Sequence, residues 1–390
     1  MTATLFEAPA QWQCATLAEL CSAEGGDIQT GPFGSQLHAS DYVEHGIPSV
    51  MPQNIGDNVI HPEGIARITS EDARRLSRYL LTEGDIVYSR RGDVERRALV
   101  RANQEGWLCG TGCLRIRPGA AVDSRYLSYY LGHPEVRRWI VRHAVGATML
   151  NLNSKILGEV PVLVPPRVIQ KSVAALLGAI DDKIAVNDRI AETTHMLAAA
   201  EHARVAQQAE RACTLGDVIE LSYGKALPAA QRRPGPVAVY GSGGPSGWHD
   251  QSLVRGPGII VGRKGTVGSV YWSHRDFFPI DTTYYISVTD DRLTTEYVYF
   301  LLTRLGLSEM NSDSAVPGLN RSRALAIPVH LPNGETIAEF TERVRPLFAV
   351  REQMARENQA LTQLRDTLLP GLMSGQLRIK DAEHVVEVAV

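Results

Sequence analysis

Two long segments of this chain carry the same periodic pattern of apolar residues. The first covers residues 169–197 and the second residues 337–368, and in both the apolar residues follow one another at alternating steps of three and four. This spacing predicts two long helices with the seam of a coiled coil. One offset of 171 positions superimposes the segments and places Asn187 on Asn358. We therefore interpret them as one unit used twice rather than as two unrelated amphipathic helices.

The expected seam is apolar apart from a few polar residues. An Asn on such a seam weakens the pairing of the helices but fixes its register. The residues that we expect to form the coiled coil and to serve as a docking surface for partners are Ile169, Val173, Leu176, Ile180, Asn187, Ile190, Leu197, Phe340, Val344, Leu347, Met354, Asn358, Leu361 and Leu368.

The segments that precede the two helices also resemble each other. The motif RRGDV at 90–94 matches RKGTV at 263–267, YLSYYL at 126–131 matches YVYFLL at 297–302, and LN at 152–153 matches LN at 319–320. The order is therefore globule, helix, globule, helix. We expect an α+β fold in which two similar α/β domains are separated by a pair of long antiparallel coiled-coil helices, as a tandem repeat with approximate two-fold symmetry. The expected boundaries are 1–166 and 213–333 for the domains, 167–212 and 334–378 for the helices, and 379–390 for a C-terminal tail.

Local signals place single elements in the first domain. Residues 125–143 have nearly helical spacing of apolar residues, and Ser124 stands where an N-cap is expected. Prolines make residues 160–166 extended. Helix 167–212 should follow directly.

Composition narrows the class of protein. A chain of 390 residues with 44% hydrophobic and 21% charged residues is ordinary for a globular protein of two or three domains. It has no apolar run of membrane-spanning length, so we expect a cytoplasmic protein with no membrane partner. Five scattered cysteines suit reduced thiols, and Cys109 and Cys113 are better explained as small core residues than as zinc ligands.

No catalytic constellation is recognisable. The glycine-rich run at 262–269 lacks the Gly-Lys-Ser/Thr ending of a phosphate loop, and neither a zinc-protease nor a hydrolase motif occurs. The adjacent carboxylates at 181–182 and 290–291 are most simply solvated. We therefore favour a binding role, with no cofactor or metal held by this chain.

Basic residues beside glycines are the main binding signal. Glycine lets the backbone approach a ligand, while arginine can bind phosphate or guanine in a fork. A single loop of this kind would be a solvated hairpin tip, but its recurrence in both copies favours nucleic acid, although the net charge is only −3. Asn in these loops could read adenine or cap a turn, and we leave both open. The candidate DNA-binding residues are Gln36, Arg90, Arg91, Arg96, Arg97, Asn151, Asn153, Lys155, Lys225, Tyr240, Ser242, Arg263, Lys264, Asn320, Arg321 and Arg323.

Over residues 17–379 the chain resembles the specificity subunit of type I restriction–modification systems. The resemblance is carried by GPFGS at 31–35, GIP at 46–48, GDIV at 84–87, AIDDKI at 179–184, RKGTVG at 263–268 and the ending LPGLMSGQL at 369–377. It implies two target-recognition domains that each read one half of a bipartite asymmetric site on double-stranded DNA.

The resemblance also implies partners. The paired helices would act as a ruler and would dock two methyltransferase subunits that bind S-adenosylmethionine and methylate adenine N6, and a restriction and translocase subunit could join them. This chain would then be a non-catalytic subunit. The alternatives are a self-contained DNA-modifying enzyme and a coiled-coil scaffold that binds proteins.

Overall fold

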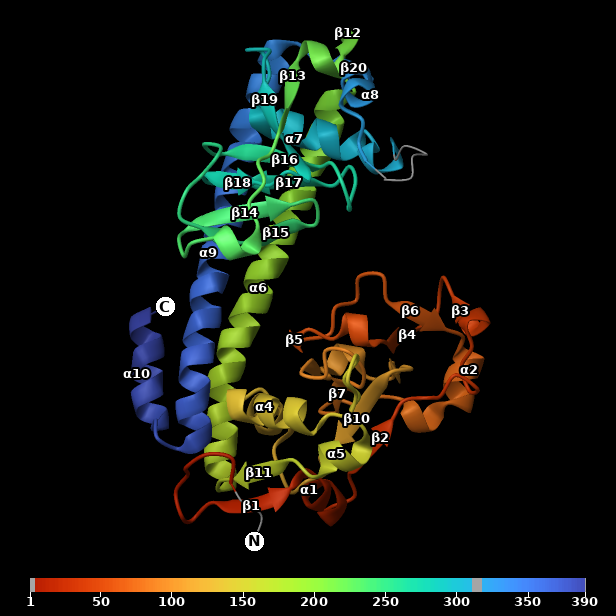
Figure 1. The fold of residues 1–390 in the computed structure, drawn as a ribbon, viewed down its shortest axis with the longest axis vertical. Helices are drawn as coiled ribbons and strands as arrows, with labels where there is room; N and C mark the ends of the chain where they lie inside the picture. The colour runs from red at the N-terminus through yellow and green to blue at the C-terminus, as the bar shows by residue number, and fades with distance from the viewer. Residues whose placement is uncertain (1–3, 311–317, 390) are drawn as a thin grey trace. The chain divides into compact units, whose positions relative to one another are not determined.

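The structure, a computed structural model, describes residues 4–310 and 318–389 (Figure 1). The chain divides into two compact units, Met1–Ile184 with Gln359–Val390, and Ala185–Asn358. We call them unit 1 and unit 2. Each unit contains one α/β domain and one part of each long helix.

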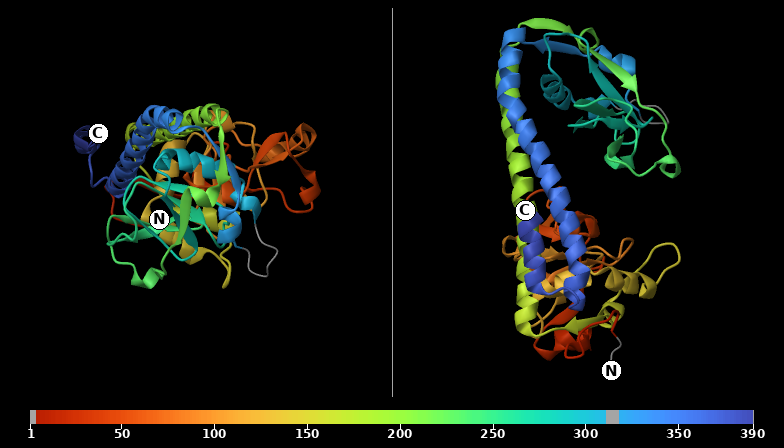
Figure 2. Two further views of the ribbon diagram at one scale, coloured as in Figure 1. Left: turned by 90° about the horizontal axis from the view of Figure 1, so that it is seen from above. Right: turned by 90° about the vertical axis from the view of Figure 1, so that its left-hand side faces the viewer.

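Two helices of similar length carry the predicted coiled-coil pattern, α6 (Arg167–Ala206) and α9 (Gly334–Ser374). In unit 1, Leu177 near the start of α6 shares a hydrophobic core with Leu368 near the end of α9. In unit 2, Val205 at the end of α6 shares a core with Phe340 near the start of α9. In both units the start of one long helix therefore packs against the end of the other, and the two helices lie side by side in Figures 1 and 2. The predicted antiparallel pair of helices is confirmed.

The seam of α6 departs from the expected one in unit 2. Ile190 is 37% and Leu197 57% exposed, so both lie on the outer face of the helix. The buried positions are instead Ala198, His202 and Val205. The prediction from periodicity placed large apolar residues on the seam. It therefore missed the alanine and the histidine that are buried there.

Most of the other expected seam residues are enclosed as predicted. The residues that are at least half-buried are Ile169, Val173, Leu176, Ile180, Asn187, Phe340, Val344, Leu347, Met354, Asn358, Leu361 and Leu368.

Unit 1 contains three small sheets. The largest has the order β2-β10-β7-β8-β5, the second has the order β3-β6-β4-β9, and β1 pairs with β11. The second sheet includes the parallel pair β4 and β9. The strands are β1 (Gln13–Thr16), β2 (Asp27–Thr30), β3 (Tyr42–Val43), β4 (Ile47–Val50), β5 (Asp57–Asn58), β6 (Ala66–Ile68), β7 (Ile86–Ser89), β8 (Arg97–Leu99), β9 (Leu108–Cys109), β10 (Cys113–Arg117) and β11 (Pro161–Val164).

Unit 2 repeats this topology. Its sheets are β13-β19-β16-β17, β15-β14-β18 and β12-β20. In both main sheets the first strand (β2 or β13) pairs with the last (β10 or β19), which pairs with β7 or β16, which in turn pairs with β8 or β17; β5 adds a fifth strand in unit 1 alone among the described residues. The pair β14 and β18 repeats the parallel pair β4 and β9. The strands are β12 (Arg211–Thr214), β13 (Ile219–Tyr223), β14 (Val237–Gly241), β15 (Gly244–His249), β16 (Gly258–Gly262), β17 (Val270–Ser273), β18 (Phe277–Pro279), β19 (Thr283–Val288) and β20 (Pro328–Leu331). The tandem repeat inferred from sequence is thus a repeat of strand order.

The shorter helices follow the same duplication. The helix after the main sheet is α3 in unit 1 and α7 in unit 2, and the short helix before the last strand is α5 or α8. The helices are α1 (Leu17–Ala23), α2 (Ser70–Arg75), α3 (Ser124–Leu131), α4 (Pro134–His143), α5 (Ser154–Gly158), α7 (Thr295–Arg304), α8 (Arg321–Leu325) and α10 (Ile379–Ala389).

Four local expectations need correction. The predicted helix 125–143 is two helices, since α3 ends before Gly132 and Pro134 opens α4. Its N-cap is Asp123, which accepts hydrogen bonds from the backbone of Arg125 and Tyr126, and not Ser124. The first long helix ends at Ala206, before β12, and the expected tail at 379–390 contains α10, which follows a turn at Gly375.

Two further findings concern the chain as a whole. None of the helices in residues 4–310 and 318–389 combines the length and the apolar character that crossing a membrane requires. All five cysteines are free, and Cys109 and Cys113 are buried in a small core beside the main sheet of unit 1, as predicted.

Candidate nucleic-acid interface

One edge of the main sheet of unit 2 gathers basic and aromatic side chains. Strand β13 ends at Tyr223, which pairs with Tyr284 of β19, and β16 ends just before Arg263. The carbonyl of Arg263 accepts a hydrogen bond of 2.9 Å from the backbone of Leu319, which brings the start of α8 to the same edge. As a result, the guanidinium carbons of Arg263 and Arg321 lie 5.4 and 6.0 Å from the ring centre of Tyr223.

The Arg263 side chain is held in place on two sides. Its Nε and Nη2 atoms donate to the carbonyl of Asp281 at 3.1 and 2.6 Å, and the ring of Tyr284 lies 6.0 Å away. Burial and the neighbouring Tyr223 raise the pKa of Tyr284 to about 12, so this phenol stays protonated at neutral pH. The guanidinium therefore has a defined orientation.

Unit 1 builds the equivalent edge from different residues. Phe33 follows β2, Arg90 follows β7, and the guanidinium carbon of Arg90 lies 5.9 Å from the Phe33 ring centre. The carbonyl of Arg90 accepts a 2.8 Å hydrogen bond from Leu152, as Arg263 does from Leu319. In both units a glycine with left-handed φ, Gly92 at +76° or Gly265 at +82°, makes the turn that follows.

Several predicted cations are unpaired. Arg91 and Lys155 in unit 1, and Lys225, Lys264 and Arg323 in unit 2, are exposed. Among the residues that the structure describes, their side chains form no hydrogen bond or ion pair, and neither does the half-buried side chain of Arg90. Unpaired cations can bind phosphate without first breaking a contact within the protein.

Other predicted arginines are already paired. Arg96 binds Asp93 at 2.8 Å and Arg321 approaches Glu220 at 3.4 Å, both in exposed settings where such pairs are weak. Arg97 differs, because its side chain is 4% exposed and binds Asp57 and the carbonyl of Ser128, each at 2.7 Å. Arg97 is a core residue, and we remove it from the interface.

The predicted asparagines make local hydrogen bonds to the protein's own backbone. Asn153 caps α5 by accepting a 2.8 Å hydrogen bond from the backbone of Ile156, and Asn320 caps α8 in the same way at 3.0 Å from Arg323. The backbone of Asn151 pairs with that of Val145. Of the two open interpretations, capping therefore describes Asn153 and Asn320.

Three polar residues in or beside the glycine-rich loops make contacts within the protein. The amide oxygen of Gln36 accepts hydrogen bonds from the backbone of Phe33 (3.2 Å) and the hydroxyl of Tyr79 (2.9 Å). Tyr240 is 8% exposed and belongs to a hydrophobic core, so it is not an interface residue. Ser242 lies in the turn between β14 and β15, where its carbonyl accepts a 2.6 Å hydrogen bond from Ser269.

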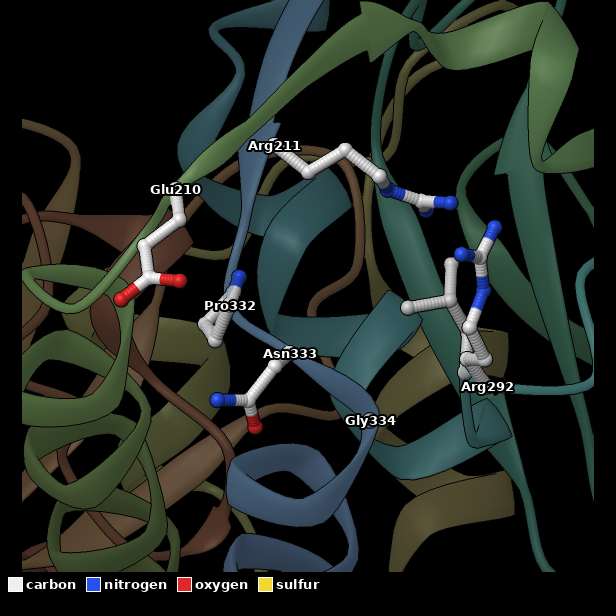
Figure 3. A pocket seen from close by; sticks show the side chains of 7 residues that line it. Glu210, Arg211, Arg292, Pro332, Asn333 and Gly334 are labelled. Atoms are coloured by element: carbon white, nitrogen blue, oxygen red, sulfur yellow. The ribbon is translucent and has the colours of Figure 1, made fainter.

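One carboxylate of each adjacent pair, Asp181 and Asp290, is enclosed and not simply solvated, which corrects the expectation from sequence; Asp182 and Asp291 are exposed as expected. The side chain of Asp290 is 7% exposed and binds Arg211 at 2.7 Å and Arg292 at 2.9 Å. Figure 3 shows the guanidinium groups of these two arginines facing each other in a cavity of about 360 Å³ near the start of α9. Because both arginines are paired with a buried carboxylate, we assign this cavity a structural role.

Asp181 anchors a second network, in unit 1. It binds Arg365 of α9 at 3.0 Å and accepts a 2.5 Å hydrogen bond from the hydroxyl of Tyr129. Arg365 also reaches Asp57 at 3.1 Å. Although burial alone would lower it, the pKa of Arg365 is raised above its ordinary value by Asp181 and its neighbours. The network joins α3, α6 and α9 to the edge of the main sheet.

Sequence reasoning missed the two aromatic residues of these edges as site residues. Phe33 and Tyr223 are each 54% exposed. Phe33 was seen only as part of a glycine-rich loop, and Tyr223 precedes Gly224 and Lys225 without a match in the first copy. The sequence signal that could have identified them is an aromatic residue followed by glycine, just after or at the end of a predicted strand.

The geometry defines a class of protein: two tandem α/β domains of one topology on an antiparallel helical pair, each presenting unpaired cations at one sheet edge. Residues 9–193 match the family described as type I restriction modification DNA specificity domain. A segment of 137 residues is 28% identical to the type I restriction enzyme HindI specificity subunit of Haemophilus influenzae, and it covers 33% of this chain but only 29% of that relative. The crystal structure of a type I restriction–modification S subunit from M. genitalium is 18% identical, with a TM-score of 0.57 over 94% of this chain and 98% of that one. The first half of the chain therefore matches the type I DNA specificity domain, and the chain as a whole has a fold similar to that of a type I S subunit.

Proposed function

We propose that this chain is the DNA-recognition subunit of a type I restriction–modification complex. Each domain binds one half of a bipartite, asymmetric site on double-stranded DNA, and the α6/α9 pair sets the distance between the halves. The domains correspond to residues 1–166 and 213–333, and the segments that contain α6 and α9 to 167–212 and 334–378. Methylation of adenine N6 is carried out by two partner methyltransferase subunits that bind S-adenosylmethionine, and a restriction and translocase subunit can join.

The observation that carries this proposal is the recurrence of unpaired cations at one place in two copies of a fold. Arg90 and Arg91 in unit 1, and Lys264 in unit 2, follow equivalent strands. A cation that only stabilised the fold would be expected to form an ion pair within the protein, as Arg97 does with Asp57. These cations recur in both domains and have no ion-pair partner within residues 4–310 and 318–389, which fits a repeated anionic ligand such as duplex DNA.

Electrostatics sets the expected strength of binding. The net charge of −3 opposes general attraction to DNA, so binding depends on these local cations. Each phosphate that a cation neutralises contributes about 0.9 to the slope of log K against log salt concentration. We therefore expect weak, steeply salt-dependent binding by the chain alone and tight binding in the complex.

The outer face of α6 supports a protein partner. Val186, Ile190 and Leu197 follow one another at steps of four and seven residues, so they lie on one side of the helix, and they are 48%, 37% and 57% exposed. An apolar stripe of this kind is typical of a surface that a partner covers. The family makes a methyltransferase subunit the partner that fits.

The proposal is tested by mapping methylated adenines across a host genome with and without this chain, with the methyltransferase partner present in both. We expect methylation at one bipartite sequence only when the chain is present. Binding of S-adenosylmethionine by the isolated chain would instead indicate a self-contained enzyme. Failure of the complex to bind duplex DNA at any salt concentration would indicate a protein scaffold.

A further inference from the structure

Each repeat places one exposed aromatic ring beside the arginine that follows the equivalent strand, and in unit 2 Arg321 lies near the same ring at 6.0 Å. The pairs are Phe33 with Arg90 and Tyr223 with Arg263, at 5.9 and 5.4 Å between guanidinium carbon and ring centre. The arginines follow β7 and β16, and the aromatic residues stand at the ends of β2 and β13, strands that hold the same places in the two sheets. The fold repeats the pair although the loops, GPFGS and LSYGK, differ in sequence.

We propose that these two pairs are the base-reading elements of the two domains. In each pair the arginine contacts the edge of a guanine through its guanidinium fork, and the ring is the positioning residue that fixes the plane of that fork. This inference rests on the proposed function, because it names the residues that give each half-site its sequence.

The orientation of Arg263 favours a base over a phosphate. A bidentate contact to guanine O6 and N7 requires a planar fork in a fixed direction, whereas a phosphate can be bound from many directions. Nε and Nη2 of Arg263 donate hydrogen bonds to the carbonyl of Asp281, and the rings of Tyr223 and Tyr284 lie beside the guanidinium group. These contacts fix the plane of the guanidinium group in the absence of DNA. Nη1 keeps its donors, since among the described residues it forms no hydrogen bond.

The surroundings of the pair supply the phosphate contacts. Lys264 directly follows Arg263, and Lys225 lies two residues after Tyr223, and both are exposed and unpaired among the described residues. In unit 1, Arg91 has the same relation to Arg90. Each edge therefore contains one arginine beside an aromatic ring and at least one exposed cation next to it, which suits a division between base readout and backbone contact.

In unit 1 the ring of Phe33 lies beside the arginine. The side chain of Arg90 forms no hydrogen bond or ion pair in the described part of the chain, and its guanidinium carbon lies 5.9 Å from the Phe33 ring centre, within the range of a cation–π contact. Removing the ring should leave the charge in place and free its direction.

The test uses the complex with its methyltransferase partner and a DNA library in which each position of both half-sites is varied. For Tyr223→Leu we expect one guanine position of one half-site to lose about fivefold in discrimination, with the other half-site unchanged; Phe33→Leu should affect the other half-site. Tyr223→Phe keeps the ring and should keep the discrimination. Trp248→Leu, at an aromatic residue that is 53% exposed outside the pairs, is the matched control and should change neither half-site.

Two results would overturn the inference: unchanged base preference in both leucine variants, or an equal loss at every position of the site. If Tyr223→Leu does not fold, Arg263→Lys decides, because lysine keeps the charge but has no fork. Lost discrimination at one guanine with retained affinity supports the inference, and retained discrimination contradicts it. Site-specific methylation by the wild-type complex tests the proposed function separately from any variant.

Discussion

The amide Nδ2 of Asn187 donates a 2.9 Å hydrogen bond to Oδ1 of Asn358, 171 residues later in the chain. The offset that superimposes the two long helices also superimposes these two residues on each other. Residues at equivalent positions of two antiparallel helices meet only near the local two-fold axis of the pair. The Asn187–Asn358 contact therefore marks the point about which α6 and α9 are related, and Asp188 adds a 2.7 Å contact to Asn358.

The two asparagines should be energetically coupled. Asn187→Leu leaves the amide of Asn358 without this partner on the seam, and we expect a loss of about 1–3 kcal/mol in the free energy of unfolding. Adding Asn358→Leu should restore much of the loss, because two apolar residues of similar shape can pack together. Urea unfolding of the two single variants and the double variant measures the coupling, and strictly additive losses would contradict a direct contact.

Arg365 should be important for the stability of unit 1. Its side chain is 11% exposed and bridges Asp181 and Asp57, so Arg365→Met removes the ion pair of the buried Asp181, whereas Asp57 keeps Arg97. We expect a loss of about 3 kcal/mol, since breaking a buried pair from one side leaves an uncompensated charge.

The matched control is Arg378→Met, which removes an ion pair with Asp381 from a side chain that is 81% exposed. This change should cost much less, because an ion pair between exposed side chains contributes little to stability. Equal losses in both variants during thermal unfolding would show that the Asp181–Arg365 network does not hold the unit together.

The fold could be predicted from sequence where a pattern was repeated. The helices α6 and α9 were identified because a seam of two dozen or more residues gives many chances to test one period, and the common offset supplied a second test. Ile190 and Leu197 were misplaced because hydrophobicity alone cannot show that Ala198 and His202 face the partner helix. The break at Pro134 was missed because apolar spacing continues across it.

Unfolding should depend on pH through buried histidines. Burial lowers the pKa of His202 to about 4, among the rings of Tyr297, Phe300 and Phe340. An unfolded histidine takes up a proton near pH 6.5, so the folded state loses stability as pH falls from about 6.5 toward 4, by at most ~1.4 kcal/mol per pH unit for each such residue.

His202→Leu should make the free energy of unfolding less dependent on pH in this window, and urea unfolding at pH 5 and pH 7 measures the change. The same substitution at the exposed His330 is the control. An unchanged slope for His202→Leu would mean that this residue is already charged in the folded protein.

Lys264 should bind phosphate rather than a base. Lys264→Gln removes an exposed cation that is unpaired among the described residues, and we expect weaker binding to all DNA sequences alike, with the salt slope reduced by about one. Titration of the complex with specific and unrelated duplexes at several salt concentrations measures both. A loss confined to the specific duplex would contradict the assignment.

The interface could be predicted from sequence only in part. Arg90 and Arg263 were proposed because the motif at 90–94 recurs at 263–267, and the structure places both after equivalent strands. The ion pairs of the arginines could not be predicted from sequence. Arg96 and Arg97 are neighbours, yet Arg96 is on the surface and Arg97 is buried against Asp57. The aromatic partners Phe33 and Tyr223 were missed because they become neighbours of the arginines only through the pairing of strands.

The central claim is that the helix pair sets the distance between two separately read half-sites. Seven residues inserted between Val186 and Asn187, with seven between Asn358 and Gln359, lengthen both helices on the same side of the asparagine pair and keep the heptad phase. The added length is ~10 Å at ~1.5 Å per residue, which is about three base pairs at ~3.4 Å each. Methylome mapping should then show both half-site sequences unchanged and a spacer longer by about three base pairs. An assembled complex that methylates sites with the original spacer would contradict the claim.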